Sequence, residues 1–144
     1  MTARELFKGY RGNKMEIARL KSDHCHRVDM VRGSSDEAPY SEKPIRISGT
    51  DTAQLTANRI KRESLEADCA FVEAAIALAP NSQIRLILEM WAYDGMHWDE
   101  IAAKLASSGI DSSKESVKQT AYRYFKTLDE KKQQKQKRLQ RKKA

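Results

Sequence analysis

Cationic and hydrogen-bonding side chains recur along residues 113–126 at spacings that place them together on one side of a helix. They are Ser113, Lys114, Lys118, Gln119, Tyr122, Arg123 and Lys126. Ammonium and guanidinium groups, an amide and a phenol on one exposed face are donors that the major groove of duplex DNA can use. The chemistry that this stretch offers is therefore hydrogen bonding to a nucleic acid.

The helix that positions these side chains is expected to have an apolar stripe on its opposite side. Its inward positions, at i, i+4, i+7, i+8 and i+11, are Val117, Ala121, Tyr124, Phe125 and Leu128. Ser112 and Glu115 have the S-x-x-E spacing of a capping box, so we expect Ser112 to cap this helix. Glu115 could also accept a hydrogen bond from a cytosine amine, but the capping role is favoured.

A shorter helix and a tight turn precede this one, so residues 96–128 have the pattern of a helix-turn-helix. The shorter helix has an acidic first turn and one narrow apolar stripe, which consists of Ile101, Ala102 and Leu105. We expect it to end at Gly109, because glycine tolerates the left-handed conformation that ends a helix. A lysine-bearing helix alone is also typical of a solvated face, but the preceding helix, turn and cap favour DNA docking.

The net charge of +7 lies mainly in the last fourteen of the 144 residues. This basic tail has no acidic residue and eight cations, which are Lys131, Lys132, Lys135, Lys137, Arg138, Arg141, Lys142 and Lys143. The remaining 19 basic residues nearly balance the 20 acidic ones. We expect the tail to be disordered or helical and to bind DNA phosphates without reading sequence.

No pattern of an enzyme, a cofactor site or a metal site occurs in the chain. It lacks a glycine-rich phosphate loop, a G-x-S-x-G motif, an H-E-x-x-H motif and paired carboxylates in an apolar setting. His24, Cys25 and His26 are adjacent, so on a helix they would not share a face, and no second ligand pair follows. We therefore predict no catalytic residue, no cofactor and no metal.

The composition indicates a cytoplasmic protein. The longest apolar run is too short to cross a bilayer, and the first residues lack the apolar core of a signal peptide. Two cysteines form no disulfide framework, and both fit a reduced compartment in which they act as small hydrophobic residues.

The first half of the chain predicts two long helices joined by a connector. Residues 3–32 have an imperfect heptad seam: Leu6, Tyr10, Asn13, Ile17, Leu20, His24, Arg27 and Val31. Gly9 and Gly12 weaken the first turns, so we expect a firm helix only after Asn13. Residues 33–50, with their glycines, serines and prolines, predict a flexible connector in which only residues 44–47 look extended.

The second long helix is expected from Asp51, with Thr50 or Asp51 as its cap, to Ala79. Its seam is Leu55, Asn58, Arg62, Leu65, Cys69, Val72, Ile76 and Ala79, and a second face adds Phe71, Ala75 and Leu78. Two apolar faces on this second helix imply two packing partners, which we expect to be the first long helix and the helix-turn-helix. A third helix, capped by Asn81 or Ser82 and reaching Tyr93, supports the last two, with Trp91 and Trp98 in or near the core.

These patterns define an all-α fold of three parts. Residues 1–79 are expected to form a coiled-coil hairpin, residues 80–130 a helix-turn-helix domain and residues 131–144 the basic tail. The polar seams need a partner to be stable, so we expect a homodimer or a higher homo-oligomer through the N-terminal helices.

Residues 83–128 resemble the region 4 domain of sigma factors, through the acidic-Gly turn at Asp94, the W-D-E-I-A run from Trp98, and Val117, Ala121 and Leu128. With the upstream helices, the layout is similar to small phage-encoded regulators of late transcription (ArpU/RinA-like proteins). The resemblance implies a sequence-specific DNA-binding transcriptional regulator in a bacterial host cell. It implies double-stranded DNA as the partner, contacted by Lys114, Lys118, Gln119 and Arg123, with RNA polymerase as a further expected partner.

Two other functions fit the same patterns. A small terminase-like DNA-packaging subunit also joins a helix-turn-helix to oligomerising helices. An interaction module could instead bind RNA polymerase without reading DNA. Sequence selection from random duplexes separates a regulator that reads DNA from the interaction module, because only a DNA reader enriches a motif, whereas a ring of eight or more subunits that binds a partner ATPase would favour the packaging subunit.

Overall fold

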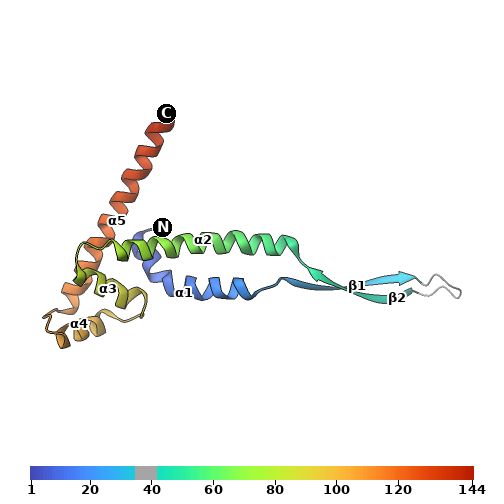
Figure 1. Ribbon diagram of the computed structural model, residues 1–144, viewed down its shortest axis with the longest axis horizontal. Helices are drawn as coiled ribbons and strands as arrows, with labels where there is room; N and C mark the ends of the chain where they lie inside the picture. The colour runs from blue at the N-terminus through green and yellow to red at the C-terminus, as the bar shows by residue number, and fades with distance from the viewer. Residues whose placement is uncertain (35–41) are drawn as a thin grey trace. The chain divides into compact units, whose positions relative to one another are not determined.

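The computed structural model describes residues 1–34 and 42–144, and it leaves aside the side chains of residues 27, 29–34 and 42–46. Figure 1 shows the elements in order: α1 (Ala3–Ser22), β1 (His26–Ser34), β2 (Glu42–Thr50), α2 (Thr52–Ala77), α3 (Ser82–Ala92), α4 (Trp98–Ser107) and α5 (Lys114–Lys143). The expected all-α fold is confirmed in that most of the described chain is helical, but the prediction did not include the two strands.

The helices and strands group into two compact units. Unit 1 contains Met1–Met15 and Leu65–Ala144, and unit 2 contains Glu16–Ser64. The predicted boundary between residues 79 and 80 does not coincide with this division. The reason is that the start of α1 belongs to the hydrophobic core of the C-terminal helices.

In unit 2, β1 and β2 form an antiparallel ribbon in which His26 pairs with Thr50 and Ser34 with Glu42. The predicted helix over residues 3–32 is therefore wrong beyond Ser22, and so is the heptad seam at its last three positions. The flexible connector predicted for residues 33–50 is strand at residues 33–34 and 42–50. Its residues 35–41 lie outside the described part.

A turn at Cys25 explains why the helix stops. Cys25 has a φ of 51°, in the left-handed region that a side chain rarely adopts. The carboxylate of Asp23 accepts a hydrogen bond of 2.9 Å from the backbone N–H of Cys25. The carbonyl of Cys25 accepts a second one, of 2.8 Å, from the backbone N–H of Asp51. These contacts redirect the chain from α1 into the β1–β2 ribbon. Heptad spacing in the sequence does not reveal them.

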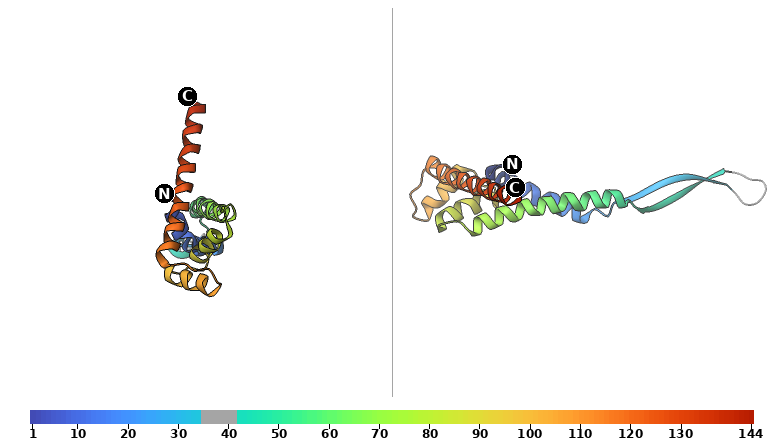
Figure 2. Two further views of the ribbon diagram at one scale, coloured as in Figure 1. Left: turned by 90° about the vertical axis from the view of Figure 1, so that its left-hand side faces the viewer. Right: turned by 90° about the horizontal axis from the view of Figure 1, so that it is seen from above.

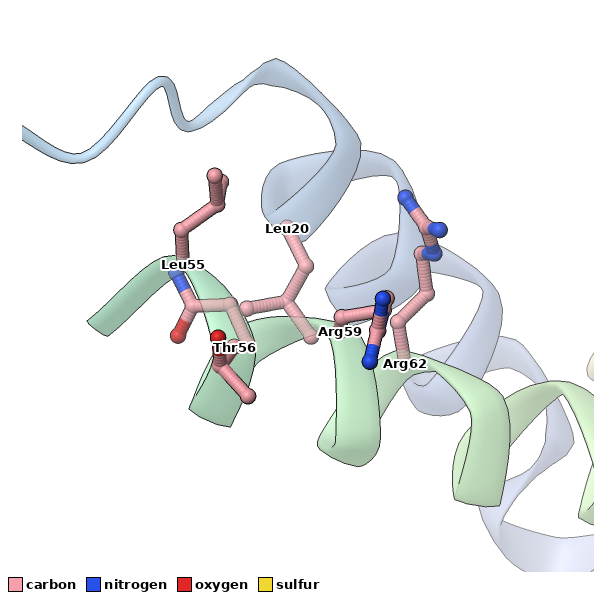
Figure 3. A pocket seen from close by; sticks show the side chains of 6 residues that line it. Leu20, Leu55, Thr56, Arg59 and Arg62 are labelled. Atoms are coloured by element: carbon pink, nitrogen blue, oxygen red, sulfur yellow. The ribbon is translucent and has the colours of Figure 1, made fainter. Parts of the chain in front are cut away.

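The helical part of unit 2 consists of the end of α1 and the start of α2. Ile17 and Leu20 are buried, as their seam positions predicted. Glu16 lies 3.0 Å from the Lys61 ammonium, and hydrogen bonds from Arg19 and Lys61 lower the pKa of Glu16 to about 2. Leu20 of α1 and residues of α2 line a small cleft of about 190 Å³, and Figure 3 shows these side chains.

The start of α1 is packed into unit 1. Leu6, Phe7 and Tyr10 are buried, and the ring centroids of Phe7 and Phe125 are 4.9 Å apart. Expecting a firm helix only after Asn13 was therefore wrong. Burying one such side chain stabilises a fold by roughly 1.5–3 kcal/mol, so three of them exceed the cost of two helical glycines, about 1 kcal/mol each.

The C-terminal part of α2 has the two predicted packing faces in unit 1. Cys69, Val72 and Ile76 are buried. On the other face, the hydroxyl of Tyr124 donates a hydrogen bond of 2.5 Å to the carbonyl of Ala75. Helix α2 ends at Ala77, two residues before the predicted end, and Leu78, which was predicted on this second face, is 80% exposed.

Candidate nucleic-acid interface

Helix α3 supports the two helices that follow it. Asn81 caps it, as predicted, by accepting a hydrogen bond of 2.9 Å from the backbone N–H of Ile84. Ile87, Leu88 and Met90 are buried, and Met90 was not among the predicted inward residues. The helix ends at Ala92, one residue before the predicted end, and Gly95 follows with a φ of 67°.

An aromatic cluster joins α3, α4 and α5. The rings of Trp91 and Trp98 stack with centroids 4.8 Å apart, and Trp91 also lies 5.4 Å from Phe125. Both tryptophans are half-buried, as predicted for residues in or near the core. This cluster fixes the start of α4 against the first half of α5.

Helix α4 has the predicted core stripe and stop. Ile101, Ala102 and Leu105 are buried. Gly109 has a φ of 87°, and the backbone N–H of Ile110 donates a hydrogen bond of 2.9 Å to the carbonyl of Leu105. This is the backbone pattern in which a glycine ends a helix.

The cap of α5 differs by one residue from the prediction. Ser113, not Ser112, has the extended backbone of a cap, and its hydroxyl accepts a hydrogen bond of 3.2 Å from the backbone N–H of Ser116. Glu115 is therefore the second residue of the helix and cannot complete a capping box, which needs the third. Either of two adjacent serines can cap a helix, and only the path of the turn selects one.

The predicted donor face of α5 is largely open to solvent. Ser113, Lys114, Gln119, Arg123 and Lys126 are exposed, whereas Lys118 and Tyr122 are half-buried. Lys114 also lies 3.5 Å from the carboxylate of Asp99. On the other side, the buried residues of the helix are Val117, Ala121, Tyr124 and Phe125, with Leu128 half-buried.

Arg4 of α1 joins this face and was missed by the sequence analysis. Its guanidinium lies 4.8 Å from the centre of the Tyr122 ring, and the Lys118 ammonium lies 5.6 Å from the same ring. The edge of Tyr122 also meets Trp98, with centroids 6.1 Å apart. Tyr122 therefore contacts the Trp98 ring with its edge and the cations of Arg4 and Lys118 with its face. No local pattern marks Arg4, because the contact joins the two ends of unit 1.

The basic tail is the second half of α5. The helix runs without a break to Lys143 (Figure 2), so of the two expected states, disordered or helical, the structure has the helical one. All of the tail's cations are exposed except Lys132, which is half-buried with its ammonium 5.3 Å from the centre of the Phe71 ring. Eighteen residues make five turns, so Lys137 lies on the same side of α5 as Gln119, and Arg141 lies one turn further.

The described part of the chain offers neither a metal site nor a membrane-spanning helix. Among the side chains that the structure describes, no three or more of His, Cys, Asp or Glu are arranged to hold a metal ion. Among the helices described, none has both the length and the apolar composition needed to cross a membrane. Comparison with protein-family models, curated proteins and solved structures finds no significant match for this chain.

Proposed function

We propose that the chain is a sequence-specific DNA-binding regulator of transcription. In this proposal α4 and α5 form a helix-turn-helix, and the first half of α5 lies in the major groove. The observation that carries the proposal is the exposed row of Gln119, Arg123 and Lys126 on a helix whose opposite face is buried. Helix α3 and the start of α1 pack against the buried face of α5 and hold this row of side chains in place. Reading bases requires such a rigid arrangement. The resemblance to phage-encoded regulators of late transcription points to phage or prophage genes as its targets.

The two halves of α5 have different roles in this proposal. The first half selects bases, since each good bidentate contact contributes roughly 1–3 kcal/mol of discrimination between base pairs. The second half binds phosphates and contributes affinity without sequence information. Arg4, beside Tyr122, extends the cationic surface next to the first half.

A selection experiment tests the reading role. Bound sequences are enriched from a random duplex pool with the full chain, and affinities for the enriched duplex and a scrambled one are measured by fluorescence anisotropy. Gln119→Ala with Arg123→Ala should reduce the preference for the enriched duplex by roughly 5- to 150-fold for each bidentate pairing with a base that the substitutions remove. The matched control, Gln54→Ala with Arg59→Ala, removes the same groups from exposed positions of unit 2 and should keep the preference.

The same experiment has two further outcomes that would change the proposal. A preserved preference in the Gln119 and Arg123 variant would show that another surface reads DNA. Failure of the parent chain to enrich any sequence would favour an interaction module that does not read DNA. A single reader helix covers few base pairs, so the proposal includes a homodimer through the N-terminal helices, and the enriched site should be palindromic.

A further inference from the structure

The apolar stripe of α5 continues beyond the part that α3 and α4 cover. Leu128 is half-buried, and Leu139, three turns further along the same side, is 52% exposed. Together with Phe71 of α2, these side chains form the floor of an open groove of about 410 Å³. The groove lies entirely within unit 1.

The rim of this groove is cationic. Lys131, Lys132 and Lys135 line it, and the Lys132 ammonium lies 5.3 Å from the centre of the Phe71 ring. No carboxylate lines the groove. An apolar floor with a positive rim is complementary to a segment that combines leucine-like side chains with acidic neighbours.

This chemistry argues against two other occupants. The same half of α5 from a second copy would bring eight cations without one acid, and like charges across an interface cost several kcal/mol. A DNA backbone would satisfy the lysines but would leave the floor of Phe71, Leu128 and Leu139 facing phosphate and water. An acidic amphipathic helix satisfies the floor and the rim together.

We infer that the groove between α2 and the second half of α5 docks a short acidic amphipathic helix of another protein. This interaction goes beyond the proposed reading of DNA. Leu128 and Lys137 are nine residues apart, which is two and a half turns, so they lie on opposite sides of α5. A protein partner in the groove therefore leaves the proposed phosphate-binding side free, and the chain can link bound DNA to that partner.

The test uses the full chain and a labelled synthetic peptide of 18 residues. The peptide has leucines at i, i+4, i+7 and i+11 and glutamates at the flanking positions, and a second peptide has the same composition in scrambled order. The ordered peptide should bind at least tenfold more tightly than the scrambled one. Leu139→Ser should weaken its binding at least tenfold, and Lys131→Glu with Lys135→Glu should weaken it further.

Two controls keep the test decisive. Lys137→Glu with Arg141→Glu makes the same change of net charge on the opposite side of α5 and should change peptide affinity less than the groove variant does. Because Leu139 is exposed, Leu139→Ser should leave the helical circular dichroism and the thermal midpoint unchanged. Equal binding of both peptides, or an unaffected Leu139→Ser variant, would overturn the inference. Weaker DNA binding by Leu139→Ser would also overturn it, because the groove would then belong to the DNA interface.

Discussion

Ser113 is the residue that starts the candidate recognition helix. Its hydroxyl satisfies the backbone N–H of Ser116, one of the donors that have no partner inside the helix. Ser113→Ala should therefore lower the free energy of unfolding by about 1 kcal/mol. Ser112→Ala is the matched control and should change it by less than about 0.5 kcal/mol. Urea denaturation gives both values, and a larger loss in the Ser112 variant would mean that the capping box at Ser112 forms after all.

Prediction from sequence succeeded at single residues where the determining contacts are local. Asn81 caps α3 and Asp51 caps α2 through hydrogen bonds to residues three positions later, and both were expected. The choice between Ser112 and Ser113 failed, because their local patterns are equivalent and the preceding turn decides. Arg4 could not be assigned, because its contact with Tyr122 depends on how unit 1 brings distant segments together.

As an element, α5 presents different chemistry on two sides of its second half. Lys137 and Arg141 continue the exposed side of Gln119, whereas Lys131 and Lys135 border the groove. If each phosphate contact contributes about 0.9 to the slope of log affinity against log salt, Lys137→Ala with Arg141→Ala should reduce that slope by about 1.8. The loss should be equal for enriched and scrambled duplexes, since phosphates carry no sequence information.

The control for this salt measurement is Lys131→Ala with Lys135→Ala, which removes the same charge from the groove side. It should leave the slope closer to that of the parent chain. Fluorescence anisotropy over a salt series gives the slopes. Equal changes in both variants would show that the tail binds DNA as a diffuse charge, without a preferred side.

Elements with strong local patterns were predicted well, and the ribbon was not. The apolar periodicity of α3, α4 and α5 determines which side each helix buries, so their existence and inward faces followed from sequence. Residues 24–31 fit a helical seam by spacing, but β1 is stabilised by backbone hydrogen bonds to residues 42–50. Pairing across the chain can override local propensity, and one sequence contains no direct signal of it.

For the molecule as a whole, the main departure from expectation is that unit 1 combines both ends of the chain. The sequence predicted that the N-terminal helix belongs to a coiled-coil hairpin of residues 1–79 and that the last helices form a separate domain. The structure instead places Leu6 and Phe7 in the core that supports α5. Heptad spacing predicted that Leu6 and Tyr10 would be buried, but not which surface would bury them.

This organisation predicts that the candidate recognition helix, α5, depends on the first residues of the chain. Phe7 is 1% exposed and packs on Phe125, so Phe7→Ala should destabilise unit 1 by about 3–5 kcal/mol. Met15 on the same helix is 75% exposed, and Met15→Ala should change stability by less than about 0.5 kcal/mol. Trp91 and Trp98 both lie in unit 1, so tryptophan fluorescence during urea denaturation reports this unit specifically.

The Phe7→Ala variant also tests whether the start of α1 supports α5 without itself contacting DNA. A chain with a weakened core should lose affinity for the enriched and the scrambled duplex together as urea or temperature rises, because the unfolded unit presents no ordered face. At low temperature, where unit 1 remains folded, the preference between the two duplexes should return to that of the parent chain, since Phe7 is buried and is not itself one of the exposed donors. A Phe7→Ala protein as stable as its parent would mean that α1 does not support α5, and the interface would then have to be rigid without it.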